Sequence, residues 1–188
     1  MIKTPPSLFW TQTKLDKPMM DYLWSQIALA KEDHKPDLVG HVSKSLILPD
    51  TEDRLFNLVN QEAIQLDYLN YDGEYSKRSF WVNYQKKYEF NPVHNHYGNV
   101  SFVIWMKIPY EYEDEKKRQP ASNVNGIALS GSFEFLFLNA LGDIQRVYYN
   151  LSPEFEGEML VFPARLYHQV YPFYTSDEER ISIAGNLH

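Results

Sequence analysis

The expected fold is decided by residues 157–168, which read GEMLVFPARLYH. A glycine opens a short apolar strand, the strand ends at the turn that Pro163 favours, and His168 follows five residues after this proline. Other short strand-like segments, separated by glycine, proline, asparagine and aspartate, are expected at 79–84, 101–108, 132–138, 144–149 and 181–184. The second half of the chain is therefore expected to be a series of short strands, as is typical of a jelly roll.

The first half of the chain has a different pattern, in which apolar residues recur at helical spacing. The elements expected there are a strand at 7–10, a helix from 16 to 34–36, a strand at 45–48 and a helix from 49 to 70–73. One apolar stripe of the second helix predicts core packing: Leu55, Leu58, Val59, Ala63, Leu66 and Leu69. We therefore predict a mainly β protein, a double-stranded β-helix (jelly-roll barrel), with a helical N-terminal support in residues 1–78 and the barrel core in residues 79–188 of a single domain, 1–188.

The composition excludes several classes of site. The 188 residues include no cysteine, so disulfides, thiolate metal sites and a cysteine nucleophile are excluded, and a transition metal must be held by histidine, carboxylate or water. The formal net charge of −7 provides no basic field for nucleic acid or anionic membrane. The sequence shows no secretory signal and no apolar run of membrane-spanning length, so we expect a cytoplasmic protein with neither membrane nor nucleic acid as partner.

Three histidines are candidate metal ligands. His94 and His96 lie in the segment NPVHNH, residues 91–96, and side chains two residues apart point to the same side of an extended chain. The third is His168, behind the strand and the proline turn. Neutral imidazole is a ligand for iron, zinc, copper and nickel. An isolated His-x-His pair is common without a metal, so it is the combination with His168 that favours a metal site.

Arg180 begins the segment RISIA, residues 180–184. Alternation along a strand places Arg180 and Ser182 on one face and two isoleucines on the other. A buried arginine needs an anionic partner, so this pair at a barrel interior indicates a receptor for a carboxylate. The alternative is an arginine at the barrel rim, paired with an acidic residue of the segment 177–179.

Residues 79–187 as a whole resemble a family of 2-oxoglutarate- and iron(II)-dependent oxygenases found in marine bacteria and phages. The resemblance is carried by the segments 81–83, 94–96, 101–105, 157–168 and 180–182 together with Asn186. It implies Fe(II) and 2-oxoglutarate as cofactors, and hydroxylation of an unidentified small-molecule or peptide substrate while 2-oxoglutarate is decarboxylated to succinate. It also implies a location in the host cytoplasm if the chain is of phage origin.

The same resemblance implies roles for individual residues. His94 and His168 correspond to iron ligands, and Arg180 with Ser182 corresponds to the receptor for the distal carboxylate of 2-oxoglutarate. His96 stands where the family has Asp or Glu. Either all three histidines bind the metal, or His96 does not bind it and water or another group takes its place. The residues expected to line the co-substrate pocket are Asn83, Tyr84 and Trp105.

Two alternatives stay open. A cupin-like metalloprotein or dioxygenase, with three histidines and no 2-oxoglutarate, fits the spacing of Gly157, Pro163 and His168, although Val100 stands where the first cupin motif has glutamate. A non-catalytic jelly roll with a binding or structural role, as in a virion, is the other alternative. A hydrolase lacks support, because the chain has no Gly-x-Ser-x-Gly and no phosphate loop.

Two further segments have expectations that the structure can test. The charged segment 111–125 is expected to be a solvated loop, or else the lid of an active site. His34 and His41 lie in the expected connection between a helix and a strand, so both are expected to be solvated.

Overall fold

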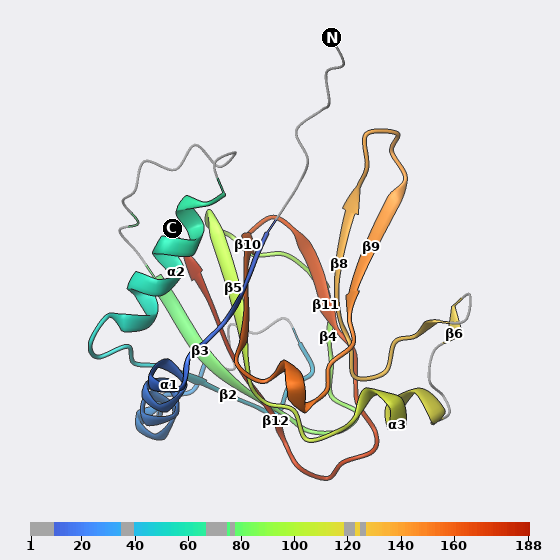
Figure 1. Cartoon of the computed structure of the whole chain (residues 1–188), viewed down its shortest axis with the longest axis horizontal. Coiled ribbons are helices and arrows are strands. Elements are labelled where there is room, and N and C mark those ends of the chain that lie inside the picture. The colour runs from blue at the N-terminus through green and yellow to red at the C-terminus, as the bar shows by residue number, and fades with distance from the viewer. Residues whose placement is uncertain (1–9, 35–39, 67–74, 76–77, 119–122, 125–126) are drawn as a thin grey trace.

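The computed structural model describes residues 10–34, 40–66, 75, 78–118, 123–124 and 127–188. Two antiparallel sheets face one another in this part of the chain (Figure 1). The larger sheet has the strand order β1 (Thr11–Lys14), β10 (Glu158–Pro163), β5 (Val100–Lys107), β12 (Arg180–Leu187), β3 (Arg78–Gln85) and β2 (Lys44–Ile47). The smaller sheet has the order β4 (Asn91–His94), β11 (Tyr167–Val170), β8 (Phe133–Leu138) and β9 (Ile144–Tyr149). The predicted jelly roll is confirmed.

Alternation along the strands gives the larger sheet two different faces. Its outer face packs on helices α1 (Lys17–Leu29) and α2 (Arg54–Ile64), which lie on the side away from the smaller sheet (Figure 1). Its inner face meets the smaller sheet through an aromatic core that includes Trp105 and Phe162 from one sheet and Phe133 and Phe135 from the other. The space between the sheets is therefore where inward-facing polar residues must find partners.

The two helices are shorter than the sequence predicts. The Asp16 carboxylate accepts a hydrogen bond from the Met19 N–H at 2.9 Å, so α1 begins as expected, but it ends at Leu29 instead of residues 34–36. Helix α2 ends at Ile64 instead of residues 70–73. Its predicted stripe is confirmed at Leu55, Val59, Ala63 and Leu66, which are fully buried, whereas Leu58 is only partly buried and Leu69 lies outside the described residues.

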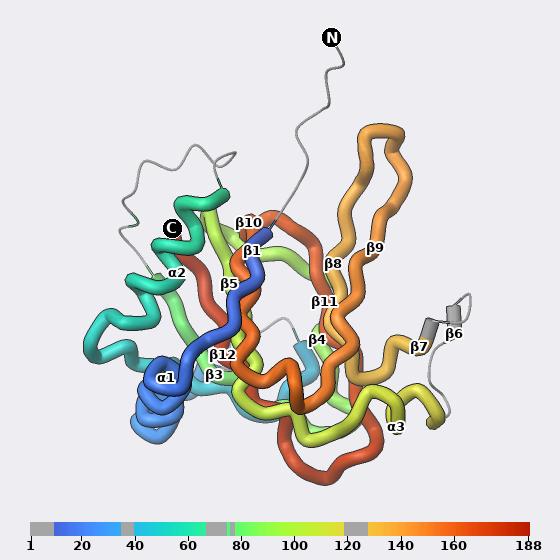
Figure 2. The backbone as a smooth tube through the Cα atoms, in the orientation of Figure 1, coloured from blue at the N-terminus to red at the C-terminus, as the bar shows by residue number. Residues whose placement is uncertain are grey.

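The N-terminal support is not purely helical. Strands β1 and β2 take the two edges of the larger sheet, and β1 lies beside β10 from the other end of the chain (Figure 2). The strand expected at 7–10 lies outside the described residues apart from Trp10, and β1 starts one residue later. The single-domain division at residue 78 stays a prediction, although strands from both halves belong to one sheet.

The charged segment 111–125 differs from the expected solvated loop. It contains helix α3 (Tyr112–Lys117) and strand β6 (Asn123–Val124), which forms a small hairpin with β7 (Ile127–Ala128). Further along the chain, outside this segment, a short 3₁₀ helix, η3, covers Pro153–Phe155. Glu115 is fully buried, and its carboxylate accepts hydrogen bonds from the backbone N–H groups of Tyr174 and Thr175. The prediction failed because a local charge run does not reveal this distant backbone partner. None of the described helices has both the length and the apolar character needed to cross a membrane.

Candidate metal centre and co-substrate pocket

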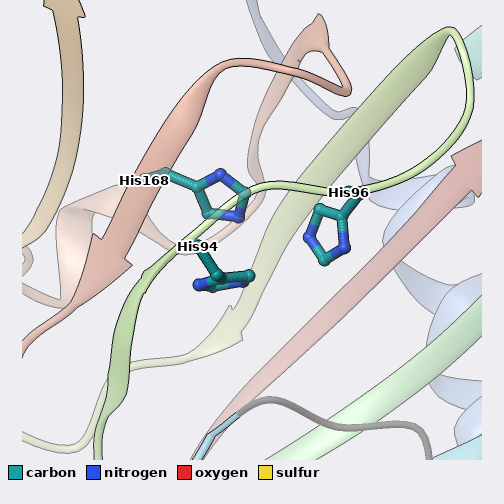
Figure 3. Close-up of side chains that lie close together, drawn as sticks. All are labelled: His94, His96 and His168. Carbon is teal, nitrogen blue, oxygen red and sulfur yellow. The ribbon is translucent and has the colours of Figure 1, made fainter.

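The structure brings the three predicted histidines together. His94 ends β4 and pairs with His168 on β11, while His96 lies two residues beyond β4 and is fixed by its backbone N–H, which donates to the Ala164 carbonyl at 2.8 Å. The three imidazole rings face one another (Figure 3), with ring centroids 4.3 Å apart for His94 and His168 and 5.0 and 5.1 Å from His96 to these two. One potential ligand atom from each histidine lies within 4.8 Å of the others.

Two of the imidazoles are held by the backbone. The Nδ1 atom of His94 lies 2.7 Å from the carbonyl oxygen of Pro92, and the Nδ1 atom of His168 lies 3.0 Å from that of Leu166. A carbonyl oxygen can only accept, so each Nδ1 carries the proton and each Nε2 presents a free lone pair. The described residues offer the His96 ring no such hydrogen bond.

Burial keeps the cluster uncharged. Burial lowers the pKa of His94, and it lowers the pKa of His96 to about 4, with a smaller contribution from His94. The pKa of His168 lies well below its ordinary value, again because of burial first and the two neighbouring imidazoles second. At neutral pH all three rings are therefore neutral, which is the form that binds a metal.

These residues fit a transition metal. Metal–imidazole bonds are about 2.1 Å long, so small rotations of the rings let one ion reach all three nitrogens. No Asp or Glu of the described chain belongs to the cluster, and the ligand set is therefore three neutral nitrogens. Such a set suits Fe, Zn, Cu or Ni and disfavours Mg or Ca.

The second predicted feature, Arg180, is buried and not at the rim. Arg180 is 2% exposed, and two of the three acidic residues expected as rim partners pair elsewhere, Asp177 with Lys87 and Glu178 with Lys107. Among the described residues, the acceptors of the guanidinium are all neutral: Gln85 Oε1 (2.5 Å), Tyr110 Oη (2.5 Å), the Gly131 carbonyl (3.2 Å) and the Tyr171 carbonyl (3.4 Å). Within the described residues, this buried charge has no carboxylate partner.

The backbone at Gly131 makes part of this arrangement possible. Gly131 has a φ of +72°, and a Cβ there would lie 2.6 Å from the ring of Tyr110. Only glycine fits a left-handed conformation at such close approach. Its carbonyl can therefore accept from both the Tyr110 hydroxyl, at 2.6 Å, and Arg180.

The remaining predicted pocket residues form a row across three strands. Ser182 on β12 pairs with Asn83 on β3 and with Trp105 on β5. All three line a cavity of about 480 Å³ that is also lined by Arg180 and the three histidines. The buried Oδ1 atom of Asn83 has no hydrogen-bond partner among the described residues, which indicates room for a polar ligand.

Two expectations about single residues were wrong. Tyr84 follows Asn83 on β3 and therefore faces the opposite way, where it packs on the outer core below Lys44. His34 is buried rather than solvated, and its ring stacks on Trp81 at a centroid distance of 4.7 Å. His41 is exposed, as expected.

Sequence reasoning missed the residues that hold Arg180. Gln85 was detectable, because alternation from Asn83 places it on the same face of β3. Tyr110 and Gly131 gave no such signal, since they reach the guanidinium from distant segments. Helix α3 does not contribute a described residue to the cavity wall, so the lid prediction for 111–125 stays untested.

The sequence from residue 79 to residue 186 matches the family described as "Putative 2OG-Fe(II) oxygenase". The chain belongs to this family. It is therefore an oxidoreductase by family, and membership implies Fe(II) and 2-oxoglutarate as cofactors. The three-histidine cluster and Arg180 both lie inside the matching region.

Solved structures share the fold. A prolyl-4-hydroxylase from Pseudomonas putida aligns over 97% of this chain and 93% of its own, with 16% identity and a TM-score of 0.56. An oxidoreductase of the 2OG-Fe(II) oxygenase family from Burkholderia pseudomallei aligns over 90% of this chain and 77% of its own, with 13% identity and a TM-score of 0.51. At these identities the likeness shows the fold alone. No curated protein has a matching sequence.

Proposed function

We propose that this chain hydroxylates a small-molecule or peptide substrate while it decarboxylates 2-oxoglutarate to succinate. One observation carries the proposal: a single cavity joins three neutral imidazoles to a buried guanidinium that lacks a described carboxylate partner. A metal centre and a receptor for a dicarboxylate are the two binding functions that such an oxygenase needs. A cytoplasmic location, with neither membrane nor nucleic acid as partner, is part of the proposal.

In this proposal the three histidines hold Fe(II), which supplies the redox chemistry that activates dioxygen. His94 and His168 present Nε2 in a fixed direction, because their Nδ1 atoms are tied to backbone carbonyls. His96 takes the third position without such a tie. A set of three histidine ligands would leave room at the ion for the co-substrate.

Arg180 binds the distal carboxylate of 2-oxoglutarate, with Ser182 and Asn83 as additional hydrogen-bonding groups. The neutral partners of the guanidinium hold it in place without cancelling its charge, so the anion is attracted into the cavity. Asn83 contributes whichever end of its amide the ligand requires, since a rotation of the amide exchanges donor and acceptor. Trp105 provides an apolar wall that excludes water.

The test is anaerobic loading with Fe(II) followed by titration with 2-oxoglutarate, recorded as visible absorption. Chelation of the metal by 2-oxoglutarate produces a saturable charge-transfer band, and we expect this band in the wild type and its loss in His94→Ala. Iron binding without any band would contradict the use of 2-oxoglutarate.

A second candidate is a three-histidine dioxygenase that does not use 2-oxoglutarate. It is favoured by His96, which gives a ligand set without a described carboxylate. The same titration separates the two, because this candidate binds iron and gives no band. A non-catalytic module would bind no iron at all.

A further inference from the structure

The lining of the cavity has an unusual charge. Among the side chains of the described lining residues, Arg180 carries the one full formal charge, and none is Asp, Glu or Lys. The whole chain has 25 acidic and 18 basic residues, so this exclusion of acidic groups is local. Five of the six histidines line the cavity, and the other polar lining groups are neutral amides and hydroxyls. The cavity is therefore suited to anions.

The cavity is longer than one co-substrate. Arg180, Ser182, Ala184 and Asn186 alternate along β12 and all line it. Asn186 lies six residue steps along the strand from Arg180, which corresponds to about 20 Å. A five-carbon dicarboxylate anchored at Arg180 is much shorter than this. The part of the cavity beyond Ala184 is therefore free to hold a second molecule.

This distal subsite, formed by His34, Trp81, Tyr97 and Asn186, presents hydrogen-bond donors and aromatic rings. The Oδ1 atom of Asn186 accepts a hydrogen bond from the Ser101 hydroxyl at 2.6 Å, so the amide NH₂ is the end left for a ligand. The rings of His34 and Trp81 stack with an interplanar angle of 25°. The Trp81 ring lies 5.9 Å from that of His96, which places the subsite next to the metal cluster.

A second cation stands at the mouth of the cavity. Tyr97 is 81% exposed, and the guanidinium of Arg165 lies over its ring at 5.5 Å from the centroid. Arg165 is exposed and makes no ion pair with a carboxylate of the described chain. Its charge is therefore available to attract an anion toward the subsite, and no Asp or Glu side chain of the described lining opposes this attraction.

We propose that the distal subsite binds the substrate and that this substrate is a small organic anion, with a carboxylate or phosphate group and a flat or apolar body that packs on Trp81. The inference rests on the proposed function. A divalent metal held by three neutral imidazoles keeps its two positive charges, and Arg180 adds a third positive charge. The 2-oxoglutarate dianion cancels two of these three, and an anionic group on the substrate balances the one that is left.

The test uses Zn(II)-loaded protein saturated with 2-oxoglutarate, so that Arg180 is occupied and no turnover occurs. The probes are 3-phenylpropionate, phenyl phosphate and the neutral 3-phenylpropionamide, and calorimetry measures the dissociation constant of each. We expect the better of the two anions to bind about tenfold more tightly than the amide, and its identity decides between carboxylate and phosphate. Equal affinities, or no binding by either anion, would overturn the proposal.

Two variants test whether the preference for anions arises at the distal subsite. Asn186→Asp keeps the acceptor for Ser101 but adds a carboxylate, so the preference for the anion is expected to disappear while the affinity for the amide stays within about twofold. Arg165→Gln, at an exposed position that does not endanger folding, is expected to weaken anion binding a few-fold. Lys117→Gln on α3 removes the same charge at a residue that does not line the cavity and is the matched control. An anion preference that survives both cavity variants would also overturn the assignment.

The titration with 2-oxoglutarate alone separates this proposal from the proposed function. If the wild type does not bind 2-oxoglutarate, the proposed function fails whatever the probes do. If 2-oxoglutarate binds and the anionic probes show no preference, only the distal subsite is wrong.

Discussion

The histidine end and the arginine end of the cavity both bury polar groups, but they hold them in different ways. His94 and His168 each bond to the carbonyl oxygen of the residue two positions earlier in the chain. Arg180 is held by residues 85, 110, 131 and 171, which come from four separate segments. The metal end is therefore built locally, whereas the co-substrate end depends on the whole fold. We therefore expect substitutions at the histidine end to change metal affinity, and substitutions at the arginine end to change the affinity for 2-oxoglutarate.

The largest expected effect is at the metal end. His168→Ala removes an oriented ligand from the buried side of the cluster. Loss of a group that only hydrogen-bonds to a metal ligand typically lowers metal affinity by roughly 10–100-fold, and we expect loss of the ligand itself to lower it further. Calorimetry with Zn(II) measures the change. His41→Ala removes an exposed histidine outside the cavity and is the control. Retained metal binding in His168→Ala would mean that the cluster is not the metal site.

Arg180→Ala tests the other end. Loss of charge-assisted hydrogen bonds of about 1.5–3 kcal/mol should weaken 2-oxoglutarate binding by about 10–150-fold while metal affinity stays unchanged. Titration of the Fe(II) form with 2-oxoglutarate measures the first quantity and titration with Zn(II) the second. Arg118→Ala, at an exposed position, is the control. Unchanged affinity for 2-oxoglutarate would remove Arg180 from the co-substrate site.

The metal end should also give the metal-free protein a pH-dependent stability. Burial holds the pKa of His96 at about 4 in the folded state, against 6.5 when unperturbed. Above pH 6.5 both states are neutral and the free energy of unfolding is unaffected. As pH falls from 6.5 toward 4, the unfolded state binds the proton first, so stability decreases, and His94 and His168 shift in the same direction.

Urea unfolding between pH 7 and pH 5, in the presence of a chelator, measures this slope. His96→Gln should make the decrease shallower, and His41→Gln is the matched control. An equal slope in wild type and His96→Gln would show that His96 does not contribute.

The difference between the two ends also explains what the sequence could predict. Spacing and alternation are local, so they placed His94 and His96 on one side of an extended chain and Ser182 on the face of Arg180. They failed where burial depends on distant partners. The sequence around His34 resembles a solvated connection, yet Trp81 covers its ring, and Glu115 is buried by backbone groups about 60 residues away.

The smallest expected effect tests whether the neutral partners of Arg180 serve to position it. Gln85 is 5% exposed, accepts from the guanidinium through Oε1 at 2.5 Å and donates through Nε2 to the Glu89 carbonyl at 2.5 Å. Gln85→Leu keeps the volume but removes both hydrogen bonds. Loss of the one to the guanidinium, about 1 kcal/mol, should raise the KM for 2-oxoglutarate about fivefold while kcat and metal affinity hold. Gln145→Leu on the exposed strand β9 is the control.

Gln85→Glu decides between two explanations of that effect. If Gln85 only holds the side chain in place, a carboxylate that binds the guanidinium more strongly should restore or improve the affinity for 2-oxoglutarate. If the cavity works because the charge of Arg180 is left for a ligand, the new carboxylate competes with 2-oxoglutarate, and affinity should fall below that of Gln85→Leu. We expect the second result, since every described partner of Arg180 is neutral.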